Sequence, residues 1–343
     1  MTMVVSLING SITNSSKPQL PPKIQTARTA SCFVLVVLLI FALFGNILVW
    51  VAFLSVKRLQ KVTNYYIVSL ATADLLVATF SIPVWILITL SLVDPKSLAY
   101  RVWLVFDIAC GTASILNLTF VSCDRYLAIT RPFSYHTLLS PSRVLATIAF
   151  SWSFATLVAS LRFRFTRYEY PVIVAVTSFF IPTLIMMFTY SCIFLVARRH
   201  ARVINVISGN QPKNKFSYVT EMKAAKVIGV VIGGFLVCWA PFLLTNLALV
   251  YCSSCEASFP FVAAYIMKLL QYTSSALNPY VYTCLNSEFR IVVKRLVCGR
   301  CAKPPLTRSS QSSVQMNELG TSNLKTLGTP SETQNDLGNC VKI

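Results

Sequence analysis

The sequence predicts an all-α membrane protein, a bundle of seven transmembrane helices followed by a short amphipathic eighth helix. Mean hydropathy is +0.65, and only 12% of the 343 residues are charged, against about 25% in soluble globular proteins. Seven apolar stretches are long enough to cross a bilayer as helices. They cover residues 31–55, 64–91, 101–130, 142–161, 170–198, 223–251 and 259–284.

The distribution of Lys and Arg predicts the orientation of these stretches. The net charge is +19, and the basic residues lie at the ends of apolar stretches, so phospholipid head groups are favoured over nucleic acid as the counter-charge. Basic clusters follow the first, fifth and seventh stretches. By the positive-inside rule these ends are cytoplasmic, which predicts a multi-pass plasma-membrane protein with an extracellular N-terminus. The fourth-to-fifth connection, with Arg162, Arg164 and Arg167, is an unusually basic outer loop.

The chain divides into four predicted parts. Residues 1–28 form an extracellular tail, 29–285 the bundle, 286–300 the amphipathic helix and 301–343 a disordered cytoplasmic tail rich in Ser, Thr, Asn and Gly. Asn9 and Asn14 each begin an Asn-x-Ser triplet in the N-terminal tail. Both are glycosylation acceptors if that tail is extracellular.

The third stretch carries ionisable residues near both of its ends. Asp107 lies near the outer end, and Asp124-Arg125-Tyr126 lies near the inner end. Eighteen residues separate Asp107 from Arg125, which is about five helical turns and roughly 27 Å along one face. Because ionisable groups are expensive inside a membrane, they predict function. We interpret Asp107 as an anion that receives a ligand and the Asp124–Arg125 pair as a switch.

The sixth stretch combines an aromatic stripe with a hinge. Phe235, Trp239 and Phe242 recur at steps of four and three residues, on one face of a helix. Pro241 removes a backbone hydrogen bond within this stripe and kinks the helix. We expect Trp239 to sense a bound ligand from below.

One signature in each stretch, in the same order, resembles the class A, rhodopsin-like G-protein-coupled receptors over roughly residues 30–300. The signatures are Gly45-Asn46, Leu70-Ala71-Thr72-Ala73-Asp74, Asp124-Arg125-Tyr126, Trp152, Pro182 with Tyr190, Phe235 with Cys238-Trp239-Ala240-Pro241, and Asn278-Pro279-Tyr280-Val281-Tyr282.

The resemblance implies a role for the carboxylate in the middle of the second stretch. An unpaired charge there costs several kcal/mol, so Asp74 must be protonated, paired or bound to a cation. The family implies a sodium ion held by Asp74, Ser114 and Asn278. The alternative is a protonated Asp74 that serves packing alone, hydrogen-bonded to Asn278 and Asn46.

The resemblance also implies how the inner end works. Glu221 begins the sixth span, where the family architecture shares Arg125 between Asp124 and Glu221 as a clamp. When the clamp breaks, Arg125, Tyr190 and Tyr282 reorganise to admit a helix of a heterotrimeric G protein. The alternative is that these charges merely snorkel at a helix end.

The ligand is predicted to be a small extracellular molecule, with a biogenic amine as the first candidate. Receptors for biogenic amines place a tyrosine at the position of Tyr272, beside the acid that holds the ammonium group; Trp239 and Phe242 would box that group, and Ser178 would meet a hydroxyl. Lys268, four residues before Tyr272 on the same face, offers an alternative, because it can itself neutralise Asp107. A peptide, lipid or nucleoside ligand, as in melanocortin or adenosine receptors, is then the second candidate.

The cysteines depart from the family pattern. Tyr100 stands where most members have the cysteine that ties the third span to the following outer loop, and no cysteine lies between Trp152 and Cys192. Melanocortin receptors and some lipid receptors share this loss. Cys252 and Cys255 in the last outer loop are predicted to form a small disulfide ring, in preference to a metal site.

Other functional classes fit the sequence less well. Opsins carry their retinal lysine at the position of Tyr272, so we expect no retinal and no other cofactor beyond sodium. An enzyme needs a catalytic constellation, but His136 and His200 have no partner at useful spacing, and we expect no catalytic residue. A transporter or channel would show polar residues spread along several stretches or paired broken helices.

The C-terminal segment predicts contacts with the membrane and with regulators. Its amphipathic run carries Phe289 on one side and Arg290 on the other, so it is expected to lie along the inner leaflet. Cys298 and Cys301 are palmitoylation candidates, or else ordinary reduced thiols. The serines between 309 and 313 are candidates for receptor kinases and subsequent arrestin binding.

Overall fold

The computed structural model describes residues 22–94, 96–166, 168–206, 212–252, 261–285 and 287–298. The positions predicted for glycosylation, Asn9 and Asn14, lie outside these residues, as do Cys255 and Cys301. The chain up to Val297 forms one compact unit. Within the described residues its regular elements are all helical, which confirms the predicted fold class.

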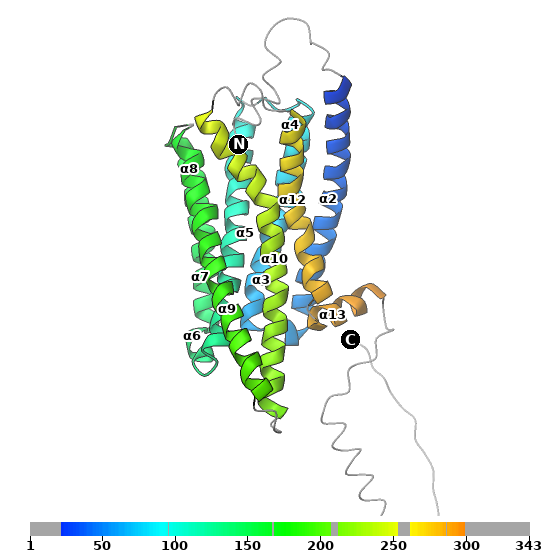
Figure 1. Ribbon diagram of the computed structural model, residues 1–343. Helices are drawn as coiled ribbons and strands as arrows, with labels where there is room; N and C mark the ends of the chain where they lie inside the picture. The colour runs from blue at the N-terminus through cyan, green and yellow to red at the C-terminus, as the bar shows by residue number, and fades with distance from the viewer. Residues whose placement is uncertain are drawn as a thin grey trace, which may run out of the picture. The chain divides into compact units, whose positions relative to one another are not determined.

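Seven long helical segments run side by side along the unit (Figure 1). They are α2 (Pro22–Ser55); α3 (Val62–Leu76), η2 (Val77–Ser81) and α4 (Ile82–Thr89); α5 (Leu98–Thr130); α7 (Pro141–Ser160) with η3 (Leu161–Phe163); α8 (Glu169–Ala175), η4 (Val176–Phe180) and α9 (Ile181–Val206); α10 (Pro212–Tyr251); and α12 (Phe261–Leu285). Short helices η1 (Lys57–Leu59) and α6 (Tyr135–Leu138) lie in connections, and α13 (Ser287–Cys298) follows the bundle.

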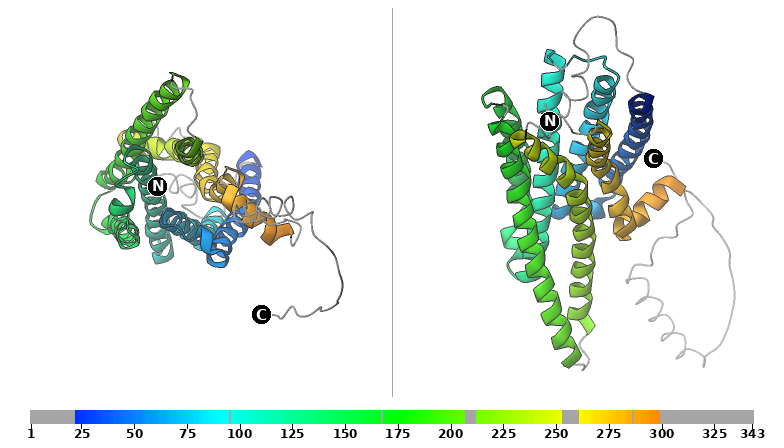
Figure 2. Two further views of the ribbon diagram at one scale, coloured as in Figure 1. Left: turned by 90° about the horizontal axis from the view of Figure 1, so that it is seen from below. Right: turned by 45° about the horizontal axis from the view of Figure 1, so that its top comes forward.

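Helix α5 is the centre of the packing. It contacts α3, α7, α9 and α10, whereas α2 packs mainly on α12 and α3. Seen along the helix axes, the segments form a ring in which neighbours in sequence are mostly neighbours in space (Figure 2). Because four helices pack around α5, most of its polar residues from Asp107 to Arg125 are buried inside the protein, away from lipid.

Several helices begin where local capping chemistry predicts. Ser97 caps α5 by accepting from the backbone N–H of Tyr100 at 3.2 Å, and Ser140 precedes Pro141 at the start of α7. The first helix starts at Pro22, before the predicted boundary at residue 29, because proline is well suited to the first helical turn. α9 and α10 likewise extend beyond their apolar stretches, to Val206 and from Pro212.

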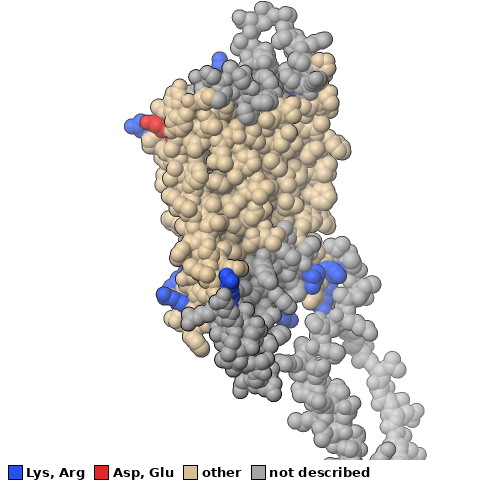
Figure 3. All heavy atoms as spheres, in the orientation of Figure 1, with Lys and Arg blue, Asp and Glu red and all other residues tan. Residues whose placement is uncertain are grey.

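The described surface is that of a multi-pass membrane protein. Six helical segments among the described residues are long and apolar enough to cross a bilayer. The described part of α12 is not among those six, and it buries Lys268, Gln271 and Asn278 against its neighbours. Figure 3 shows a belt with hardly any charged side chain and several Lys and Arg at the end that we predict to be cytoplasmic.

Two segments contain a π-helical turn that precedes a proline. η2 ends at Ser81 before Pro83, and η4 (Val176–Phe180) ends before Pro182. Such turns accommodate an extra residue and rotate the side chains that follow. They lie in the outer half of the bundle, where Ser81 and Ser178 contribute to the site described next.

Candidate functional site

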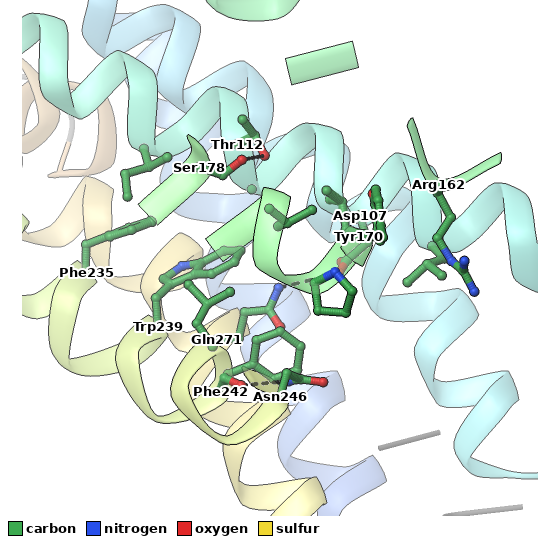
Figure 4. A pocket seen from close by; sticks show the side chains of 17 residues that line it. Asp107, Thr112, Arg162, Tyr170, Ser178, Phe235, Trp239, Phe242, Asn246 and Gln271 are labelled. Atoms are coloured by element: carbon green, nitrogen blue, oxygen red, sulfur yellow. Dashed lines mark hydrogen bonds between the residues drawn. The ribbon is translucent and has the colours of Figure 1, made fainter. Parts of the chain in front are cut away.

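The outer half of the bundle contains a pocket that is partly open to solvent, and Figure 4 shows the side chains that line it. The empty space between its lining atoms is about 770 Å³, a figure that includes open solvent, and the centre of a water-sized sphere has access to about 60 Å³ of it. Most of its lining is apolar, with a few convergent polar groups, which is typical of small-molecule sites. The lining residues are Leu104, Asp107, Ile108, Gly111, Thr112, Ile115, Arg162, Tyr170, Pro171, Val174, Ser178, Phe235, Trp239, Phe242, Leu243, Asn246 and Gln271.

Asp107 is the acidic residue of the pocket wall, and its carboxylate is fully engaged. Lys268 donates from Nζ to Oδ2 at 2.8 Å, and both side chains are only 1% exposed. Tyr272 donates its hydroxyl to Oδ1 at 3.1 Å, and Gln271 donates Nε2 to Oδ2 at 3.4 Å. The ion pair that the sequence offered as an alternative to an external amine is therefore present in this structure.

The Lys268 ammonium group also lies inside a cage of aromatic rings. Its Nζ is 4.6 Å from the ring centroid of Tyr272, 5.2 Å from Phe242, 5.3 Å from Trp103 and 5.5 Å from Trp85. It donates a further hydrogen bond to Gln271 Oε1 at 2.8 Å. A carboxylate combined with aromatic faces is the chemistry that proteins use to bind ammonium ligands. Here the protein's own lysine occupies that position.

The outer wall of the cage is fixed by aromatic packing. Trp85 and Trp103 stack with centroids 5.4 Å apart, and Trp103 donates Nε1 to the Ser81 carbonyl at 3.0 Å. Tyr100, which replaces the cysteine of the usual outer disulfide, is 2% exposed and packs on Trp103 at 5.5 Å. A buried tyrosine thus occupies the end of α5 where most relatives would carry that cysteine.

Trp239 forms the floor of the pocket. It stacks on Phe235 at 5.3 Å and donates Nε1 to Ser274 Oγ at 3.1 Å. Gly111 of α5 allows this position, because a Cβ there would lie 2.3 Å from Trp239 Cη2. Movement of the Trp239 ring is therefore coupled directly to the backbone of the central helix.

Further polar groups line the pocket away from Asp107. Thr112 of α5 donates its hydroxyl to Ser178 Oγ of η4 at 3.0 Å, and both residues line the pocket. Asn246 donates Nδ2 to the Phe242 carbonyl at 2.6 Å. At the mouth the guanidinium carbon of Arg162 lies 5.6 Å from the ring centroid of Tyr170.

Asp74 lies deeper in the bundle, on α3. It is 1% exposed, and Asn278 donates Nδ2 to its Oδ2 at 2.9 Å. Asn46 donates to the backbone carbonyls of Ala42 and Ser275. Ser114 lines a small second cavity that reaches from Asp107 down to Ser275. Asp74 is not among the lining residues of that cavity. The Asp74 carboxylate and the Ser114 hydroxyl are oxygen donors of the kind that suits a hard monovalent cation.

The inner end of α5 holds a hydrogen-bonded charge network. Arg125 pairs with the Asp124 carboxylate and donates Nη2 to Thr63 Oγ1 at 2.6 Å. Tyr135 of α6 donates its hydroxyl to Asp124 Oδ1 at 2.8 Å. Burial, and then the charge of Asp124, raise the pKa of Tyr135 to about 12. The phenol therefore remains a hydrogen-bond donor throughout the physiological pH range.

The structure describes the side chains of some of the other predicted switch residues and not those of others. The ring centroids of Tyr126 and Phe188 lie 6.5 Å apart. The Tyr190 ring packs against Gly229 of α10, where an added Cβ would lie 2.9 Å from the ring. Pro241 and Pro279 lie inside α10 and α12. The side chains of Glu221 and Tyr282 lie outside the described residues, so the Arg125–Glu221 clamp stays a prediction.

The last outer loop and α13 carry the remaining predicted sites. Cys252 is disulfide-bonded, and its predicted partner Cys255 lies outside the described residues. In α13, Phe289 is fully buried and Arg290 is exposed, as an amphipathic helix requires. The side chain of Cys298 is not among those described.

Sequence reasoning missed several pocket residues. Gln271 lies three residues after Lys268 and Trp103 lies four residues before Asp107, so helical spacing contained a signal for both. In the sequence, Arg162 stands out only as one of three Arg residues in an outer loop. Its place in the pocket depends on the path of a loop, which no periodic pattern encodes.

Comparison with known proteins identifies the family. A family model described as 7 transmembrane receptor (rhodopsin family) matches residues 45–171 and 163–282. The histamine H2 receptor of Cavia porcellus is 31% identical, over 83% of this chain and 83% of its own length. The D(1A) dopamine receptor of Didelphis virginiana is 29% identical, over 84% and 77%. Dopamine receptor 1 of Drosophila melanogaster is 30% identical, over 77% and 61%.

Proposed function

Because this chain belongs to the rhodopsin family of seven-transmembrane receptors, we propose that it transduces a small extracellular ligand to heterotrimeric G proteins at the plasma membrane, with its N-terminus outside the cell. The ligand enters the outer pocket, and the G protein binds at the inner end beside Arg125. Receptor kinases and arrestin then act on the serine-rich tail.

The ligand class that we propose first is the biogenic amines. The supporting observation is the cage around Asp107, in which a carboxylate and four aromatic rings surround an ammonium group. Relatives named as dopamine and histamine receptors are consistent with this class. The Thr112–Ser178 hydroxyl pair, which also lines the pocket, is suited to a polar group elsewhere on such a ligand.

An amine reaches Asp107 only by displacing Lys268. That displacement breaks a buried ion pair and leaves the lysine without its carboxylate, which is costly in a low-dielectric interior. Lys268 therefore acts as a built-in competitor, and it lowers the affinity for external amines. Replacing Lys268 with an uncharged residue of similar length should leave Asp107 and the aromatic rings free to bind an amine.

The test is a G-protein activation assay in cells with matched surface expression. Dopamine and histamine are titrated against the wild type, Lys268→Met and Asp107→Asn, with the exposed Arg101→Gln as control. Lys268→Met should respond to an amine at a concentration at least tenfold lower than the wild type requires. Asp107→Asn should lose any amine response. An amine response that survives Asp107→Asn would contradict recognition through this carboxylate.

The inner half couples the pocket to the G protein. Asp74, Ser114 and Asn278 would hold a sodium ion, which when bound stabilises the inactive packing of α3, α5 and α12. A ligand that presses on Trp239 shifts α10 about Pro241 and changes the cavity lined by Ser114. The Arg125 side chain then exchanges Asp124 for the G protein.

A further inference from the structure

Among the residues that the structure describes, three charged side chains lie in or beside the outer pocket, and two of them form a pair. Asp107 and Lys268 form a buried pair with no net charge. Arg162 is the third, at the mouth, where it lines the pocket and contacts the Tyr170 ring. Within the described part of the chain, its guanidinium nitrogens have no hydrogen-bond or ion-pair partner.

The position of Arg162 is defined by its surroundings. It lies in the turn η3 (Leu161–Phe163), and the ring beneath it is held because Tyr170 donates its hydroxyl to the Ala159 carbonyl at 3.2 Å. Glu169, an acidic residue of the same connection, accepts from the N–H and hydroxyl of Thr166 at 3.2 Å and 3.1 Å. Figure 4 shows Arg162 beside Tyr170 at the edge of the pocket.

Below Arg162 the pocket is mainly apolar. Leu104, Ile108, Val174, Ile115 and Leu243 line its walls down to Trp239. A ligand that fills it therefore needs an apolar body, and its outer end meets a guanidinium group. A cationic outer end would be repelled there, whereas a carboxylate forms strong bidentate hydrogen bonds with guanidinium.

We propose that the ligand of this receptor carries an acidic group that pairs with Arg162 at the pocket mouth, while its apolar body extends toward Trp239. The inference rests on the proposed function and adds a second recognition point to the same pocket. Because the charges of Lys268 and Asp107 compensate each other within the buried pair, the acidic group can pair with Arg162 whether or not the ligand also carries an amino group. An amino acid-like ligand, with both groups, also fits.

The experiment compares ligands that differ only in their charged group. The full-length receptor is assayed for G-protein activation and, after purification, for thermal stabilisation by 3-phenylpropionate, 3-phenylpropan-1-ol, 3-phenylpropylamine and phenylalanine. A decyl series (decanoate, decan-1-ol, decylamine) repeats the comparison with a longer apolar body. The variants are Arg162→Gln and Arg162→Lys, with the exposed Arg164→Gln as the matched control.

The expected result is an acid at least tenfold more potent than the matched alcohol in the wild type. That advantage disappears in Arg162→Gln, is reduced in Arg162→Lys, and persists in Arg164→Gln. An alcohol equal to the acid, or an acid preference that survives Arg162→Gln at matched surface level, overturns the proposal.

A separate readout distinguishes failure of this inference from failure of the proposed function. If Lys268→Met responds to dopamine or histamine but no acid is preferred, the receptor function stands and the acidic-group proposal is wrong. If no variant responds to any compound while all reach the cell surface, both proposals are wrong.

Discussion

The Lys268–Asp107 pair allows a quantitative test of how this bundle is held together. Both side chains are 1% exposed and their charged atoms lie 2.8 Å apart. Removing one partner of a buried pair leaves an uncompensated charge and costs about 3–5 kcal/mol. Lys268→Met and Asp107→Leu should each destabilise the receptor by that amount. Using roughly 2–4 °C per kcal/mol for large domains, each Tm should fall by about 6–20 °C.

The double variant should behave differently from the sum of the two. Replacing a whole buried ion pair with apolar side chains is often neutral or stabilising, so its Tm should lie within about 4 °C of the wild type or above it. The coupling energy of the cycle should then be at least about 3 kcal/mol.

The assay is thermal unfolding of purified receptor in detergent, followed by a thiol-independent probe. Lys96→Met, the same change at an exposed outer lysine, controls for the substitution itself. Single variants as stable as the control would refute the reasoning. A double variant whose loss equals the sum of the two single losses would refute it as well.

Three other predictions concern the floor, the middle and the inner end of the bundle. Gly111→Ala should abolish ligand-induced signalling, because its Cβ would lie 2.3 Å from the Trp239 ring, whereas Gly233→Ala, with nothing within 4 Å, should signal normally at the same surface level. Sodium chloride should raise the Tm of the wild type relative to N-methylglucamine chloride, and Asp74→Asn should remove that difference; a sodium effect that persists would exclude the site. Tyr135→Phe should lower the Tm by a constant amount from pH 6 to 9, because a pKa raised to about 12 keeps the phenol protonated there. The pKa of Tyr135 in the folded protein lies above its unfolded value of about 10, so the stability that the phenol contributes is complete below pH 10 and is lost as the pH rises through 12. A Tm difference between Tyr135→Phe and the wild type that varies between pH 6 and 9 would contradict this prediction.

The fold could be predicted because membrane spans leave a strong signal. A long apolar stretch must form a helix in lipid, where each backbone polar group needs an internal partner. The helix ends were less predictable. α9 and α10 extend beyond their apolar stretches to Val206 and from Pro212, since polar helices continue outside the bilayer without an apolar signal.

The site could be predicted only in part. Helical spacing placed Lys268 and Tyr272 on one face, but whether the lysine reaches Asp107 depends on how α12 packs across from α5. That packing is set by many weak contacts, mainly those of α12 with α2 and α10. The sequence marks the loop that carries Arg162 as unusually basic, but no periodic pattern places this side chain in the pocket.

The lysine cage also has a consequence for how such receptors diverge. Lysine codons become a methionine, glutamine or asparagine codon by one base change, so a single mutation at position 268 would empty the cage while its rings and Asp107 remain. The reverse change would close an amine site just as abruptly. Ligand class can therefore change in one evolutionary step here, while overall similarity to amine receptors, at 29–31% identity with those compared above, barely changes.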